Sequence, residues 1–156
     1  MNALTLELQR DAMDSSVALT DLLRKALVVA RKLKIAEFQR WIECELNGYH
    51  DTPVEIPTYR EVRGDIEAWN PYNGWIPVII QDEKLSASIR KRKIDQPISE
   101  LESLVKVNNK QGFFQISFPQ KIENMLMNGT DSLLRPVLHI GRNQIHGILD
   151  SSKHNP

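Results

Sequence analysis

Seven residues near the middle of the chain, Trp69-Asn-Pro-Tyr-Asn-Gly-Trp75, combine aromatic rings with amide side chains. Aromatic planes can stack on a flat ligand while amides hydrogen-bond its edge, so this segment could bind a nucleobase or nucleotide. The candidate ligand-binding residues in it are Trp69, Asn70, Tyr72, Asn73 and Trp75. The alternative is structural, with both tryptophans folding back as a lid on the helices. Because large aromatic side chains are usually largely buried, the lid is the favoured interpretation.

Three arginines complete the candidate set: Arg60, Arg63 and Arg142. Arg60 falls on the inward face of a predicted strand, where a guanidinium is costly unless it is paired. Its planar fork could hold a phosphate or carboxylate of a ligand. Glu43 or Glu45 could equally be its structural partner, and we favour this ion pair. The basic run at residues 90–93 is expected to be a solvated helix end.

No other pattern in the sequence suggests catalysis or metal binding. The four histidines are scattered and Cys44 is the only cysteine. Motifs typical of α/β-hydrolases, P-loop proteins, dinucleotide-binding folds and zinc proteases are missing. With histidines and a cysteine so dispersed, we predict no metal, and we predict no cofactor. No nucleophile, base and oxyanion donor come together in the sequence, and we leave enzymatic activity open.

Apart from Arg142, the candidate residues lie on or directly before a predicted β-hairpin. Apolar and polar residues alternate through residues 61–68, which is typical of a strand with one buried face. The inward set is Val62, Gly64, Ile66 and Ala68. A short β-branched run at residues 76–80 predicts the second strand. Asn70-Pro71 starts the turn, and Asn73-Gly74 offers a position for positive φ.

Helical periodicity predicts three helices in the first third of the chain, at residues 4–13, 20–34 and 35–47. Thr20 is the expected N-cap of the second, and Ser99 with Glu102 is an expected capping box for a later helix. Further strands are predicted at 114–118 and 137–140. The last helix is expected to begin near Arg142 and to stop at Ser151.

Bulk composition fits one ordinary globular domain. The chain has 156 residues, 41% hydrophobic and 26% charged,. Twenty basic residues balance twenty acidic ones, so no overall field would attract nucleic acid or anionic lipid,. With one cysteine, no apolar run long enough for a bilayer and no secretion signal at the start, we expect a cytoplasmic protein with no membrane partner.

The chain resembles the AbiTii domain family, a bacterial domain associated with abortive infection, from about Leu4 to Asp150. The matching segments are LLRKALVVARKLKIAEFQRWIECELNGY from Leu22, REVRGDIEAWNPYNGWIPVI from Arg60, QPISELESL from Gln96, FPQKIENMLMNG from Phe118 and PVLHIGRNQIHGILD from Pro136. Several separate segments agreeing in order are more specific than a single motif. The resemblance implies a role in phage defence, often as the N-terminal module of longer proteins. It supplies no catalytic residues.

Together these features predict an α+β fold, with a helical N-terminal part packed on a small, mainly antiparallel sheet that has a central hairpin. Residues 1–150 are expected to form one AbiTii-like domain, and residues 151–156 a tail or the shortened end of the last helix. The expected function is that of an accessory or regulatory phage-defence domain acting through self-association, partner docking or ligand sensing. Its partner would be a second copy or a linked effector protein, with a nucleotide or a phage-derived molecule as ligand.

Two alternatives remain open. The first is a toxin enzyme acting on a nucleotide or nucleic acid through Arg60, Arg63 and the aromatic segment. The second is an oligomerisation scaffold built on the two long helices.

Overall fold

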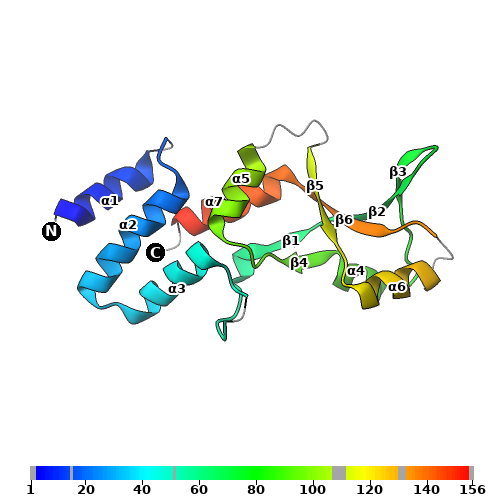
Figure 1. The fold of residues 1–156 in the computed structure, drawn as a ribbon, viewed down its shortest axis with the longest axis horizontal. Helices are drawn as coiled ribbons and strands as arrows, with labels where there is room; N and C mark the ends of the chain where they lie inside the picture. The colour runs from blue at the N-terminus through cyan, green and yellow to red at the C-terminus, as the bar shows by residue number, and fades with distance from the viewer. Residues whose placement is uncertain (1–2, 15, 51, 107–111, 130–132, 155–156) are drawn as a thin grey trace. The chain divides into compact units, whose positions relative to one another are not determined.

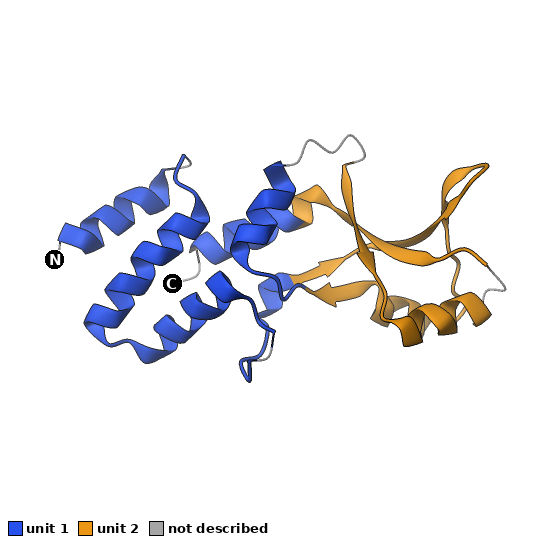
Figure 2. Ribbon diagram, in the orientation of Figure 1, with its two compact units in different colours: residues 1–60, 94–108, 145–156 blue, residues 61–93, 109–144 orange. Residues whose placement is uncertain are grey.

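The computed structural model describes residues 3–14, 16–50, 52–106, 112–129 and 133–154. Helices and strands are both well represented, which confirms the predicted α+β class (Figure 1). The chain divides into two compact units, coloured separately in Figure 2. The helical unit contains residues 1–60, 94–108 and 145–156, and the sheet unit contains residues 61–93 and 109–144.

The helical unit is organised around a hairpin of two helices. Helix α1 spans Ala3–Met13, α2 spans Leu19–Leu33 and α3 spans Ala36–Asn47. Lys34 ends α2 in the left-handed conformation, with φ of 56°, and lets the chain reverse into α3,. The predicted break at this position is confirmed. The buried stripe of α2 includes Leu22, Ala26 and Ala30, and Ile42 of α3 is also buried.

The start of α2 is capped by a distant residue. The helix begins after Ala18, and the Thr20 side chain is not its N-cap. Instead, Glu102 of α5 (Ile98–Lys106) accepts hydrogen bonds from the backbone N–H groups of Leu19 and Thr20, each at 3.0 Å. The Thr20 hydroxyl also bonds this carboxylate. The predicted Thr20 cap and Ser99–Glu102 capping box are therefore both wrong, because Glu102 serves another helix whose free N–H groups favour an anion.

The last helix, α7, spans Arg142–His154. The prediction that it stops at Ser151 is wrong. Ile145, Ile148 and Ser152 are all buried, so one face stays inside the protein along most of its length. Residues 155–156 lie outside the described residues.

The sheet unit contains a four-stranded antiparallel sheet in the order β3-β2-β6-β5. Its strands are β2 (Asp65–Asn70), β3 (Gly74–Pro77), β5 (Phe113–Ser117) and β6 (Pro136–Gly141). One face carries Ile66, Ala68, Leu138 and Ile140, all buried, and helix α6 (Gln120–Gly129) contacts β6. Figure 1 shows α6 and α4 (Glu83–Ile89) running beside the sheet.

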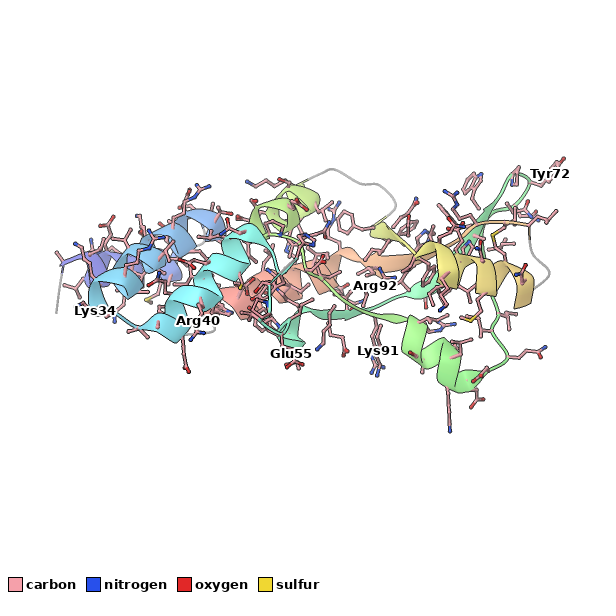
Figure 3. All side chains as sticks on the ribbon, turned by 60° about the horizontal axis from the view of Figure 1, so that its bottom comes forward. Lys34, Arg40, Glu55, Tyr72, Lys91 and Arg92 are labelled. Atoms are coloured by element: carbon pink, nitrogen blue, oxygen red, sulfur yellow. The ribbon has the colours of Figure 1, made fainter. Side chains whose placement is uncertain are left out.

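A second ribbon precedes the main sheet. Strand β1 (Glu61–Arg63), which follows the short 3-10 helix η1 (Thr58–Arg60), pairs antiparallel with β4 (Lys91–Lys93). Because α4 ends at Ile89, most of the basic run forms this strand, and the predicted helix end at residues 90–93 is wrong. The antiparallel hydrogen bonds to β1 override the helical preference of lysine and arginine. Figure 3 shows Lys91 projecting away from the ribbon.

Candidate functional site

The predicted hairpin forms the centre of the candidate site. In the β2–β3 register Trp69 lies opposite Trp75, and Asn70 lies opposite Gly74. The Asn70 side-chain oxygen accepts hydrogen bonds from the backbone N–H groups of Tyr72 at 2.8 Å and Asn73 at 3.2 Å. Gly74 takes φ of 74°, as the sequence predicts for this turn,.

This turn presents aromatic side chains to solvent. Tyr72 is 92% exposed at the tip of the hairpin, where Figure 3 labels it, and Trp69 is 52% exposed. The rings of Trp69 and Trp75 meet edge to face, with centroids 5.3 Å apart and an interplanar angle of 72°. An edge-to-face pair of this kind holds both indoles in fixed orientations.

Two neighbouring strands extend this group into an aromatic face. His139 of β6 lies 4.3 Å from Trp75, ring centroid to ring centroid. Phe113 of β5 stacks on His139 at 4.0 Å, with an interplanar angle of 25°. Because Trp69, Trp75, His139 and Phe113 alternate with the buried side chains of the sheet, they share its opposite face,. We call these four residues the aromatic face. The two indoles contact each other, and Trp75 also contacts His139 and Phe113. The lid on the helices that the sequence favoured stays a prediction.

A carboxylate fixes the orientation of the buried imidazole. His139 Nδ1 lies 3.0 Å from Glu67 Oε1, and the His139 side chain is only 3% exposed. In the neutral imidazole with the proton on Nδ1, that nitrogen donates to Glu67 and Nε2 is left as an acceptor. Within the described residues, His139 Nε2 and Trp75 Nε1 are buried without a hydrogen-bond partner. The aromatic face therefore contains two ring nitrogens that could bond a ligand.

Gly64 sets how closely β2 approaches β6. A Cβ atom at residue 64 would lie 2.2 Å from the backbone oxygen of His139. Only glycine allows this approach. It lies one residue before Asp65, which pairs with His139 in the sheet register. The glycine thus helps to fix the strand that supplies Glu67 and Trp69.

Arg60 has a structural role in the helical unit. It is completely buried, and its Nε donates to Glu45 Oε2 at 2.8 Å. Its Nη1 donates to the carbonyl oxygens of Ile94 at 2.9 Å and Gln96 at 2.7 Å. The ion pair favoured from the sequence is present, and Glu45, one of the two acids considered, is the partner. These contacts hold the guanidinium in place.

Burial changes the proton affinity of the groups beside Arg60. It raises the pKa of the Glu45 carboxyl above its ordinary value, and the Arg60 guanidinium opposes that rise,. Burial also raises the pKa of the Tyr49 hydroxyl, whose ring lies 4.8 Å below the Arg60 guanidinium carbon. The Ser152 hydroxyl of α7 donates to Glu45 Oε1 at 3.3 Å. This network ties α3, η1 and α7 together inside the helical unit.

The other candidate arginines lie outside the aromatic face. Arg63 is exposed on β1, and its backbone N–H donates to the Gln144 side chain at 2.7 Å. Arg142 begins α7, and its backbone N–H donates to the Gly112 carbonyl at 3.2 Å. The structure thus brings together Trp69, Asn70, Tyr72, Asn73 and Trp75 on one hairpin, whereas Arg63 lies on β1 and Arg142 at the start of α7.

Sequence reasoning missed His139, Phe113 and the pairing role of Glu67. These residues join the site through the β2–β6 and β5–β6 registers, which link positions at least 20 residues apart in the chain. The available signal was the alternation of residues 113–117, which places Phe113 on the face opposite Phe114,.

Two further properties of the described residues concern metal ions and membranes. No group of three or more histidine, cysteine, aspartate or glutamate residues there is arranged to hold a metal ion. None of the helices in that part of the chain combines the length and the apolar character needed to cross a bilayer.

Comparison with known proteins identifies the family. Searches among curated proteins and among solved structures gave no significant match. The family model of AbiTii, in contrast, matches residues 3–154 of the 156 residues. AbiTii domains are associated with abortive infection, a form of defence against phage. A match over nearly the whole length shows that the chain belongs to the AbiTii family.

Proposed function

We propose that this AbiTii domain is a ligand-sensing module of a phage-defence system, and that it binds a flat heteroaromatic ring, such as a nucleobase, on the aromatic face. The supporting observation is the combination of exposed and unsatisfied aromatic groups. Trp69 and Tyr72 offer ring surface to solvent, while His139 Nε2 and Trp75 Nε1 have no hydrogen-bond partner within the described residues.

The chemistry of such a ligand follows from these groups. A nucleobase carries a planar π surface and both donor and acceptor atoms on its edge. It could stack on Trp69 and, after a small shift of Trp75, bond the two ring nitrogens that lack partners. A purely aliphatic ligand would leave those nitrogens unsatisfied, which costs free energy.

Ligand sensing is favoured over catalysis because the pair of Glu67 and His139 has no nucleophile beside it in the contacts described,. A carboxylate that orients an imidazole also serves as a simple anchor in a binding site. The output of sensing would be docking of a linked effector or of a second copy of the chain.

The test is a titration of the protein with the four nucleoside monophosphates, followed by tryptophan fluorescence and by melting temperature. Binding to the folded state raises the melting temperature by mass action. Stacking of one base on an aromatic side chain contributes about 1–3 kcal/mol, so Trp69→Ala is expected to weaken binding roughly 5- to 150-fold. Because Trp69 is half exposed, the variant should keep its fold.

Phe38→Ala is the matched control for loss of a partly exposed aromatic ring. Phe38 stacks on Trp41 in the helical unit, with centroids 5.8 Å apart, and takes no part in the aromatic face. Its removal should leave nucleotide affinity unchanged. The proposal fails if no nucleotide shifts the melting temperature, or if Trp69→Ala and Tyr72→Ala both bind like the wild type. Measuring the molecular mass with and without ligand separates sensing coupled to assembly from assembly alone.

A further inference from the structure

An apolar hollow within the helical unit is a second candidate binding site, separate from the aromatic face. It has a volume of about 300 Å³ and lies between α1, α2, α3 and the end of α7. Leu22 and Ala26 of α2 form its floor, Leu8 comes from α1, and Phe38 and Trp41 come from α3. Protein interiors are normally close-packed, so a hollow of this size in a small helical unit is unusual and is a candidate site for a bound ligand.

Helix α1 closes one side of the hollow, and charged contacts help to hold it against α2. No residue of α1 is fully buried. Lys25 of α2 bonds two acids on α1, Glu7 at 3.0 Å and Asp11 at 2.5 Å. The Lys25–Glu7 pair is exposed and contributes little to stability, whereas the Asp11 side chain is only 17% exposed,. We expect a ligand to enter the hollow past helix α1, the side that has no fully buried residue.

The walls favour an aliphatic ligand. They consist mainly of aliphatic and aromatic carbon. The indole N–H of Trp41 already donates to the Tyr59 hydroxyl at 2.9 Å, and the Ser152 hydroxyl already donates to Glu45. A nucleotide or another strongly polar molecule would lose its hydration here without matching hydrogen bonds.

The one charged side chain that lines the hollow is Lys153. In the described part of the chain Lys153 makes no salt bridge within 4.0 Å. The pKa of the Asp14 carboxyl is lowered, first by its hydrogen bonds from Ser16 and to a smaller extent by Lys153. Lys153 thus lies near Asp14 without a salt bridge to it and remains able to pair with an anionic headgroup.

The size of the hollow sets the length of the ligand. A water molecule takes about 30 Å³ of liquid, and a methylene group is of similar size, so the hollow holds roughly ten carbons. Each methylene buried in the hollow adds favourable transfer free energy, so affinity should rise with chain length until the hollow is filled. We propose that the hollow binds an unbranched acyl chain of about ten carbons whose carboxylate pairs with Lys153.

The experiment is isothermal titration of the full chain with decanoate below its micelle-forming concentration, in parallel with decanol. The wild type should bind both. Lys153→Met should weaken decanoate binding about two- to fivefold, the range expected for one partly exposed ion pair, and leave decanol binding unchanged. Lys32→Met is the matched control, because Lys32 is an exposed lysine of α2 outside the hollow and its loss should change neither affinity.

A second variant tests whether the ligand binds in the hollow, independently of the charge of Lys153. Ala12→Leu adds carbon to the α1 wall of the hollow and should abolish binding of both ligands while the melting temperature stays equal or rises. Ala12 is only half-buried, so this change should be tolerated by the fold. The proposal is overturned if decanoate gives no binding heat with the wild type. It is also overturned if Ala12→Leu binds normally, or if the hollow is instead covered by a second copy, seen as a doubled mass that decanoate does not alter.

Discussion

Replacing Gly64 with alanine tests the packing that positions the aromatic face. A Cβ atom there would lie 2.2 Å from the backbone oxygen of His139 and 2.9 Å from its carbonyl carbon. The contacted atoms belong to the backbone of a central strand, so a side-chain rotation cannot relieve the clash. Overpacking of a well-packed interior costs about 1–3 kcal/mol, and a backbone clash belongs at the upper end.

We therefore expect Gly64→Ala to lower the free energy of unfolding by about 3 kcal/mol. For a chain of this length, that corresponds to a fall in melting temperature of roughly 6–12 °C. The assay is urea unfolding followed by tryptophan fluorescence, since Trp69 and Trp75 report on the same sheet.

Gly147→Ala is the matched control. Gly147 lies in α7, and a Cβ atom there would meet nothing within 4 Å. Alanine favours a helix over glycine by roughly 0.8–1 kcal/mol, so this variant should be more stable than the wild type. A Gly64→Ala protein as stable as the wild type would refute the close approach of β2 to β6.

Three further predictions concern the helical unit. Glu45→Gln should lower the free energy of unfolding by about 3–5 kcal/mol in urea titrations, because it leaves the buried Arg60 charge without its partner,. A loss below about 1 kcal/mol would contradict a buried ion pair. Tyr49 holds its proton more tightly in the folded state than at its ordinary pKa of 10.0, so its contribution to stability is fully present below pH 10 and is lost as the pH rises further,. Tyr49→Phe should reduce this loss of stability above pH 10, measured as the urea midpoint at a series of alkaline pH values. If the urea midpoint of the variant falls with pH as steeply as that of the wild type, Tyr49 is not the cause of the loss. Glu102→Ala should lower the free energy of unfolding by about 1 kcal/mol, because it removes the cap of α2,. Glu100 is an exposed acid on the same helix as Glu102, so Glu100→Ala should change the melting temperature little. Equal effects of the two substitutions on the melting temperature would rule out the cap.

The sequence predicted the features that depend on neighbouring residues. The alternation through residues 61–68 identified Val62, Ile66 and Ala68 as buried, because strand geometry sends successive side chains to opposite faces,. Asn70 and Gly74 identified the turn, because few residue types support its backbone conformation,. These local preferences act within a few residues.

Features that depend on distant partners could not be predicted. Glu102 has the right spacing for its own capping box, yet it caps α2, more than 80 residues away in the chain. The basic run at residues 90–93 has helical propensity, yet its last three residues pair with β1. His139 carries no local signal of its position beside Glu67 and Trp75, because that position depends on the register of β6 against β2. Tertiary contacts decide such cases.

The most direct test of ligand sensing at the aromatic face is an NMR titration that follows the indole N–H signals of the three tryptophans during addition of nucleoside monophosphates. We predict that the signals of Trp69 and Trp75 shift on binding, Trp75 most strongly as its Nε1 gains a hydrogen bond. Trp41 lies in the helical unit, and its indole N–H already donates to Tyr59, so its signal should stay in place. Shifts confined to Trp41, or no shifts at saturating nucleotide, would contradict the account.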